Sequence, residues 1–92
     1  MSYRFHKIDE DFRCHVWAKG RNVEGKDPDL WRMDICGYIM NYKDHDKCTE
    51  FGWEIDHIFP VALGGTDELS NLQPLHWENN RRKGDCYPWI FW

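Results

Sequence analysis

A carboxylate stands directly beside an imidazole at Asp56-His57, and this pair offers two functions that hydrolysis of a phosphate ester needs. The carboxylate supplies hard oxygen ligands for a divalent cation, which can stabilise charge on a phosphate and on a leaving oxygen. The imidazole can take a proton from water near neutral pH, and such a base contributes about 10² to 10⁴-fold to a rate. A carboxamide oxygen from a later segment can complete a sparse metal shell. These residue types indicate metal-assisted hydrolysis.

The two side chains can share one site only where the backbone allows it. Adjacent residues on a regular strand point to opposite faces, so a strand that carries Asp56 and His57 must end or distort there. Pro60 follows closely and makes such an ending reasonable. Glu54 stands two residues before Asp56 and therefore on its face, as a further ligand or as a partner of the ligands. We rank Glu54 below Asp56 as a site residue.

The residues around this pair form a longer pattern between Gly52 and Asp85. It reads acid-x-Asp-His, then Gly64-Gly65, then Asn-Leu-Gln-x-Leu from Asn71, then Asn80 with basic residues after it. In this order and spacing the pattern resembles the HNH endonuclease family, whose ββα-metal (His-Me finger) motif is two short antiparallel strands, a loop between them and a helix around one metal.

The resemblance implies a role for each residue at a matching position. Asp56 corresponds to the metal-binding acid and His57 to the base that activates water. Asn71 corresponds to the middle Asn, which pins the loop and orients the catalytic His, and Asn80 corresponds to the second metal ligand. The implied reaction is hydrolysis of DNA phosphodiester bonds with one divalent ion, Mg²⁺, Mn²⁺ or Zn²⁺, leaving 5'-phosphate and 3'-hydroxyl ends.

One departure from the family pattern concerns a structural zinc. Many relatives carry two Cys-x-x-Cys pairs around the motif, and the second pair would fall at His76 and Asn79, neither of which is Cys. The family's structural zinc is therefore doubtful here, and an aromatic core and an N-terminal helix are the alternative source of stability. The remaining alternative is an irregular zinc site formed by Cys36, His45, Cys48 and Cys86. The spacing of these four residues is unlike common zinc patterns.

The far end of the site leaves alternatives open. If a helix starts at His76, then His76 and Asn80 share one face while Asn79 is offset, which favours Asn80 as the ligand. The same face makes His76 a candidate phosphate contact or third ligand, against a capping or packing role. The basic run is either a solvated helix end or a nucleic-acid contact, and we favour the contact for at least one of Arg81, Arg82 and Lys83.

Three helical segments, two strands and a short extended piece are expected to position these residues. A stripe at spacings of three and four predicts a helix within residues 5–19, on Phe5, Ile8, Phe12 and Val16. Asp27-Pro28 resembles a second helix start. Apolar runs at 35–42 and 51–59 predict strands that pair as a hairpin, 72–75 is a brief extended piece, and 76–84 fits a two-turn helix.

We therefore expect one α+β domain spanning residues 1–92. It would have an N-terminal helical part at 5–34, a short antiparallel sheet and a small ββα-metal core at about 51–85. Ninety-two residues with 41% hydrophobic content are enough for one modest core. No apolar run is long enough to span a bilayer, so we expect a cytoplasmic protein that binds no membrane.

The formal net charge of -4 weighs against a nucleic-acid partner, because such proteins usually present a basic surface. Carboxylates that bind a cation inflate this sum, and local charge is more informative than the total. Two rivals to a nuclease remain: a nucleic-acid-binding module that does not cut, and a structural zinc protein. The apolar segment 87–92 either covers the core or forms a surface for a protein partner or a homodimer.

Overall fold

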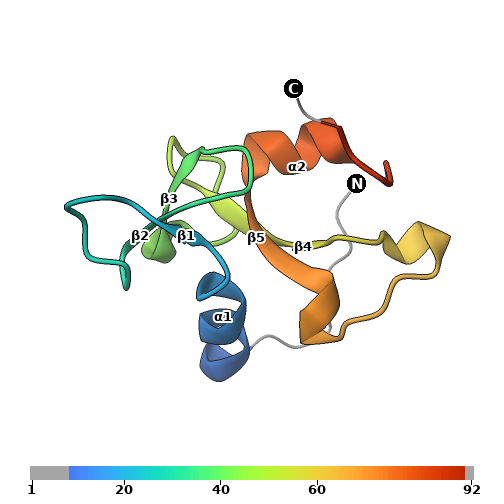
Figure 1. The fold of residues 1–92 in the computed structure, drawn as a ribbon, viewed down its shortest axis with the longest axis horizontal. Helices are drawn as coiled ribbons and strands as arrows, with labels where there is room; N and C mark the ends of the chain where they lie inside the picture. Colours follow the sequence, from blue (N-terminus) through green and yellow to red (C-terminus); the bar gives the residue numbers. More distant parts are fainter. Residues whose placement is uncertain (1–8, 91–92) are drawn as a thin grey trace.

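The computed structural model describes residues 9–90 of the chain. Two antiparallel sheets lie beside two helices, and the chain passes through the first sheet before it enters the second (Figure 1). The observed α+β architecture with a ββα unit near the C-terminus is the one the sequence predicts. Among the described residues, no helix is long and apolar enough to cross a membrane.

Helix α1 spans Glu10–Trp17, with Asp9 as its N-cap. The Asp9 carboxylate accepts a hydrogen bond from the backbone N–H of Phe12 over 2.8 Å, which satisfies one of the N–H groups left unpaired at a helix start. Val16 and Trp17 are buried, and the helix packs against the strand that precedes the C-terminal helix. The predicted N-terminal helix is confirmed over this part, whereas Phe5 and Ile8 lie outside the described residues.

A three-stranded antiparallel sheet follows, formed by β1 (Arg21–Asn22), β2 (Trp31–Met33) and β3 (Ile39–Asn41) in that order. The helix start predicted at Asp27-Pro28 is wrong, and strands β1 and β2 lie within the predicted helical part at 5–34. The Asp27 carboxylate accepts from the N–H of Asp29 over 2.9 Å, and its carbonyl accepts from Trp31 over 2.8 Å. This closes a single turn, after which strand pairing takes over.

The predicted strand at 35–42 is present only as β3. Asp34 shortens it, because its Oδ1 accepts hydrogen bonds from the N–H groups of Cys36 and Tyr38, both over 2.9 Å, and so holds a turn. The predicted hairpin between this strand and the next is also wrong. Strand β3 pairs with β2, and a single backbone bond of 3.0 Å from Asn41 to Phe51 links it toward the following strand.

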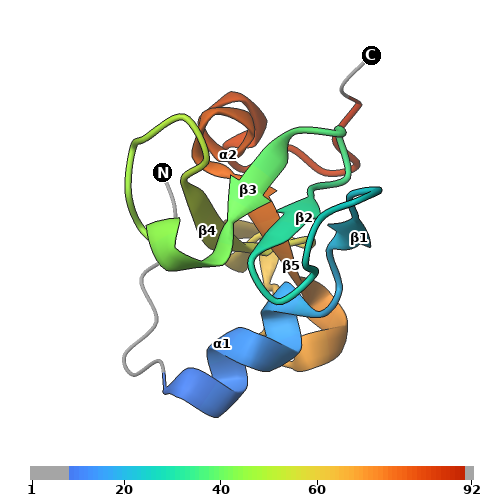
Figure 2. The same ribbon diagram turned by 90° about the vertical axis from the view of Figure 1, so that its left-hand side faces the viewer.

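The ββα unit consists of β4 (Trp53–His57), β5 (Leu72–His76) and α2 (Trp77–Lys83). The two strands are antiparallel, and α2 follows β5 without a loop and packs on both strands. A long connection between β4 and β5 carries two short helical turns, at Val61–Leu63 and Leu69–Asn71. Figure 2 shows α1 and α2 on opposite sides of this strand pair.

Alternation along β4 directs Trp53 and Ile55 to one face of the strand and Glu54 and Asp56 to the other. Trp53 and Ile55 belong to the buried cluster with Trp17, and the rings of Trp17 and Trp53 lie 4.9 Å apart. The intervening residues, Glu54 and Asp56, bond instead to side chains of α2. The hydrophobic core therefore lies on the α1 side of β4, and the polar face of the strand turns toward α2.

Candidate active site

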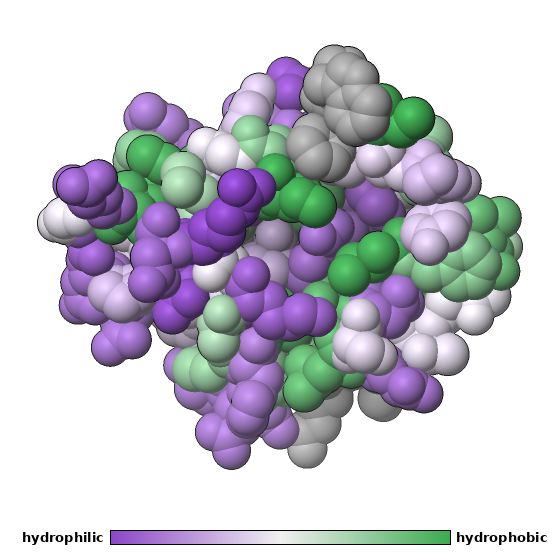
Figure 3. Space-filling view, viewed as in Figure 1, coloured by the Kyte–Doolittle hydropathy of each residue, from purple (hydrophilic) through white to green (hydrophobic). Residues whose placement is uncertain are grey.

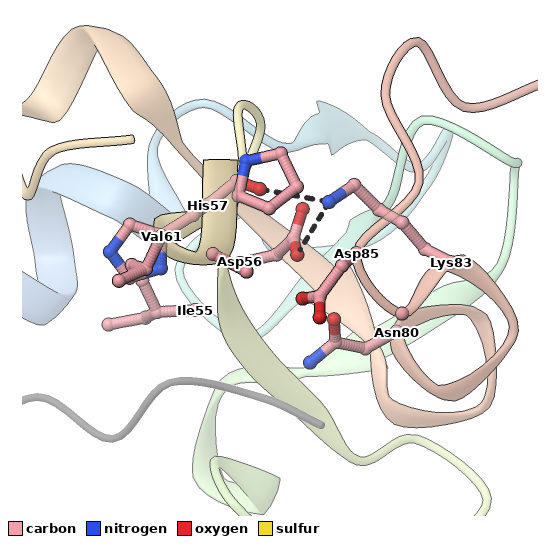
Figure 4. Close-up of a pocket in the computed structure, with 10 residues that line it drawn as sticks. Ile55, Asp56, His57, Val61, Asn80, Lys83 and Asp85 are labelled. Atoms are coloured by element: carbon pink, nitrogen blue, oxygen red, sulfur yellow. Dashed lines mark hydrogen bonds and ion pairs between the residues drawn. The ribbon is translucent and has the colours of Figure 1, made fainter. Parts of the chain in front are cut away.

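A cavity of about 290 Å³ opens where β4 ends and the last turn of α2 passes over it. Its lining combines both parts of the predicted motif, because Asp56 and His57 come from β4 and Asn80 and Lys83 from α2 (Figure 4). Asp85, just beyond α2, also lines the cavity. The ββα unit thus brings the two ends of the sequence pattern to one place.

Asp56 is buried beneath α2, with both carboxylate oxygens engaged. Oδ1 lies 3.2 Å from Nζ of Lys83, and Oδ2 accepts a hydrogen bond of 2.9 Å from the side-chain amide of Gln73. Burial raises the pKa of Asp56, while the bond from Gln73 and the charge of Lys83 oppose that rise. These two donors hold the buried carboxylate in one orientation.

Lys83 is buried, whereas a side chain that contacts a phosphate at the surface would be exposed. Its side chain is only 3% exposed, and Nζ also donates to the carbonyl oxygen of His57 over 2.9 Å. Helix α2 packs on β4, and Lys83 at the end of the helix reaches the last residue of that strand. The structure therefore corrects the expectation for Lys83, which contacts Asp56 rather than facing outward.

His57 is buried at the last residue of β4, on the other side of the strand from Asp56. The register stays regular through this residue, with His57 opposite Leu72, and a bond of 2.8 Å from Ile58 to Asn71 continues the pairing. Figure 4 accordingly shows the imidazole turned away from the Asp56 carboxylate, toward Val61. Both residues line the same cavity because it wraps around the end of the strand.

The imidazole of His57 contacts a carboxylate that sequence reasoning did not single out. Nε2 lies 2.7 Å from Oδ1 of Asp67, which belongs to the connection between β4 and β5. One indirect signal was present in the sequence, since a general base needs an acceptor on its second ring nitrogen and Asp67 follows the Gly64-Gly65 pair in the motif.

Asn71 fastens the long connection at both of its ends. Its carboxamide oxygen accepts from the N–H of Phe59 over 2.8 Å, and its Nδ2 donates to the carbonyl oxygens of Phe59 over 3.0 Å and Thr66 over 2.8 Å. Phe59 stands two residues after His57, and Thr66 stands beside Asp67. The loop-pinning role implied for Asn71 agrees with these bonds, which act on either side of the imidazole and its acceptor.

Asn80 is held in the cavity by a hydrogen bond to Glu54. Its Nδ2 donates to Oε1 of Glu54 over 2.6 Å, and its carboxamide oxygen points toward Asp85 in Figure 4. Glu54 thus contacts Asn80 and fixes which end of the carboxamide faces the cavity. Asp56 and Asn80 present the hard oxygen donors that suit a divalent cation with a sparse protein shell completed by water.

Comparison with known families agrees with this geometry. Residues 41–85 match the model of the HNH endonuclease family, and the match contains β4, β5 and α2. This part of the chain belongs to the HNH family. Membership indicates a function related to nucleic acid. No curated protein and no solved structure shows significant similarity to the chain.

The HNH domain places His76 and Asn79 away from the cavity. His76 is the N-cap of α2, where Nδ1 accepts from the N–H of Glu78 over 3.1 Å and Nε2 lies 2.7 Å from the carbonyl oxygen of Glu50. Both ring nitrogens serve this buried junction, so of the two roles left open for His76 the structure favours capping and packing over a phosphate contact or third ligand. The Nδ2 of Asn79 donates to Asp34 over 2.9 Å, and Asn80 alone of the two asparagines lines the cavity.

Arg81 and Arg82 are exposed on the last turn of α2 of the HNH domain. The Arg82 guanidinium donates to the hydroxyl of Tyr38 over 2.9 Å, and the Arg81 guanidinium lies 5.2 Å from the ring centre of Trp77. Each is therefore partly fixed by an aromatic neighbour while it faces solvent.

The irregular zinc site that the sequence left open is not assembled in the described part of the chain. No group of three or more His, Cys, Asp or Glu side chains there is placed to hold a metal ion. His45 is turned toward Trp53, with ring centres 4.7 Å apart, and burial lowers the pKa of its imidazole. This arrangement gives no support to the structural zinc alternative.

Exposed apolar side chains border the cavity of the HNH domain. Val61 and Leu63 are exposed on the turn after β4, and Figure 3 shows apolar surface on that side of the molecule. Tyr87 is exposed beyond α2 and packs edge-on against Phe59, with ring centres 4.9 Å apart. A protein partner or homodimer at the aromatic C-terminus stays a prediction, and residues 91–92 lie outside the described residues.

Proposed function

We propose that this chain is a metal-dependent endonuclease that hydrolyses DNA phosphodiester bonds. The observation that carries the proposal is the meeting of Asp56, His57 and Asn80 at one cavity of an HNH domain. In this proposal these residues supply a general base and two oxygen ligands for a metal ion. The two exposed arginines on α2 provide local positive charge on the helix that carries Asn80, in a chain whose formal net charge is -4.

In the proposed mechanism His57 takes a proton from a water molecule, whose oxygen attacks the phosphorus. The bond from phosphorus to the 3' oxygen breaks, and that oxygen is protonated by solvent, leaving 5'-phosphate and 3'-hydroxyl ends. Asp56 and Asn80 would hold Mg²⁺, Mn²⁺ or Zn²⁺, and a divalent ion there stabilises charge on the phosphate and the leaving oxygen. Asn71 keeps the loop around His57 closed, while Glu54 and Gln73 orient the two ligands.

A plasmid-nicking assay tests this function. The wild type is compared with His57→Ala, Asp56→Asn and the control His15→Ala, which removes an exposed imidazole on α1. Each protein is offered supercoiled plasmid, linear duplex, single-stranded DNA and RNA with Mg²⁺, Mn²⁺ or Zn²⁺. We expect cleavage by the wild type and the control, and loss of cleavage in the two site variants with unchanged circular dichroism. Undiminished cleavage by the His57 variant would remove the proposed base.

The second candidate function is a nucleic-acid-binding module that does not cut. It is favoured by the contact between Lys83 and Asp56, because a buried ammonium supplies positive charge where a metal would otherwise be held. A gel-shift assay run beside the nicking assay separates the two functions. DNA binding without cleavage under any of the three metals would replace the nuclease proposal with this one.

A further inference from the structure

We propose that Asp67 is a positioning residue for His57. By its contact with the imidazole, Asp67 selects which ring nitrogen of His57 takes the proton from water. The inference rests on the proposed function and deepens it, since it concerns the same site. It starts from the contact of 2.7 Å between Oδ1 of Asp67 and Nε2 of His57. The sequence pattern gives only an indirect signal for Asp67 and does not assign it a part in the reaction.

The chemistry of the two groups fixes which of them donates. An ionised carboxylate has no proton to give, so the hydrogen bond requires the proton on Nε2. The neutral imidazole is then held as the Nε2–H tautomer, and Nδ1 carries the lone pair that a general base needs. His57 is 5% exposed, so the protein rather than bulk water sets its tautomer.

The loop geometry places the carboxylate at the imidazole. Gly65 allows a close approach, because a Cβ built there would lie 1.7 Å from the carbonyl oxygen of Phe59. The N–H of Gly65 donates to the carbonyl of Pro60 over 2.9 Å, and Asn71 holds the carbonyl of Thr66, the residue before Asp67, over 2.8 Å. Asn71 therefore acts on His57 through Asp67.

The pair also stabilises the product of the proton transfer. When Nδ1 accepts a proton from water, the ring becomes an imidazolium whose Nε2–H still points at the Asp67 carboxylate. The proton on Nε2 stays in place, so no further transfer is needed. Asp67 has a side chain that is 53% exposed, which weakens the charge effect in water and leaves orientation as its main contribution.

Kinetics provide the first test. Asp67→Ala is expected to lower kcat about 10 to 100-fold, as loss of a partner that orients a site histidine does, with KM for DNA unchanged within about twofold. Asp67→Glu, which retains a carboxylate, should recover part of the loss. Glu68→Gln is the matched control, because it removes a carboxylate from the next, also exposed, residue. Wild-type kcat in the Asp67→Ala variant would overturn the proposal.

The second test needs neither metal nor activity. Ring-nitrogen chemical shifts of His57 are recorded by heteronuclear NMR on the metal-free wild type, Asp67→Ala and Glu68→Gln in mildly alkaline buffer. The wild type and the control should show a protonated Nε2 and an unprotonated Nδ1, and the Asp67 variant should show averaged tautomers. Identical patterns in all three proteins would contradict the pairing. A wild type that cuts no nucleic acid overturns the proposed function instead, and the NMR comparison still decides the pairing.

Discussion

Lys83 and Asp56 form an ion pair of 3.2 Å between two side chains that are 3% and 6% exposed. The lysine comes from the end of α2 and the aspartate from β4, so the pair ties the helix to the strand at the floor of the cavity. In the metal-free protein the ammonium supplies positive charge at the oxygens that would otherwise face a cation. Stability and metal binding should therefore be linked through this contact.

The first prediction is that Lys83→Met destabilises the metal-free protein by about 3 kcal/mol, because it leaves a buried carboxylate without its partner. Urea unfolding measures this, with Lys47→Met, an exposed lysine, as the control. Added Mn²⁺ should raise the Tm of the Lys83 variant more than that of the wild type, since the ion replaces the missing charge. An equal rise in both proteins would show that the metal does not bind at Asp56.

A second buried carboxylate, Asp34, joins the N-terminal sheet to the ββα unit. It is 1% exposed, and its Oδ2 accepts from the N–H of His76 over 3.0 Å and from Nδ2 of Asn79 over 2.9 Å. His76 and Asn79 are the positions where the family resemblance places a zinc-binding Cys pair. Hydrogen bonds to one carboxylate thus occupy the place that a structural metal has in many relatives.

The second prediction is that Asp34→Ala destabilises the fold by at least about 3 kcal/mol, because four N–H donors lose their acceptor in a buried position. Asp29→Ala removes an exposed carboxylate nearby in the sequence and should change stability by less than about 0.5 kcal/mol. Thermal and urea unfolding measure both. A Tm for Asp34→Ala equal to that of the control would mean that this network contributes little.

The parts of the site that could be predicted are those encoded by local patterns. The strand at Trp53–His57 and the helix at Trp77–Lys83 each follow from a run of residues with its own period and end signals. Asp56 and His57 are neighbours in the sequence, so their approach to one cavity needs only the end of a strand. Predicting that Asn80 reaches the same cavity required one further step, because the chain must first return alongside β4 as β5.

The parts that could not be predicted depend on contacts between distant segments. Lys83 lies beside two exposed arginines in the sequence, and only the packing of α2 on β4 buries it against Asp56. Asp67 meets His57 only because the loop bends back at Gly65. The prediction of a helix start at Asp27-Pro28 was wrong for another reason. The same capping hydrogen bond can start a helix or close a single turn, and the pairing between β1 and β2 selects the turn.

The third prediction concerns Arg81 and Arg82 as residues that bind the nucleic-acid backbone. Arg81→Ala and Arg82→Ala should each weaken DNA binding alike for all sequences, and should reduce the slope of log K against log salt by about 0.9 for each phosphate that the variant no longer neutralises. Fluorescence anisotropy across a salt series measures this. Arg21→Ala, on β1, is the control, and an unchanged slope in both α2 variants would contradict a role for this helix end.

The fourth prediction follows from the pKa of Cys36, which burial and the neighbouring Asp34 carboxylate raise to about 11. The folded protein holds this thiol proton more tightly than the unfolded chain, whose ordinary value is 9.0. The resulting stability is present below about pH 9 and is lost as the pH rises toward 11. Alkylation by iodoacetamide, mapped by mass spectrometry at rising pH, should modify exposed Cys86 near pH 8 and Cys36 only at higher pH. Equal rates at the two thiols near pH 8 would show that Cys36 is not held in its protonated form.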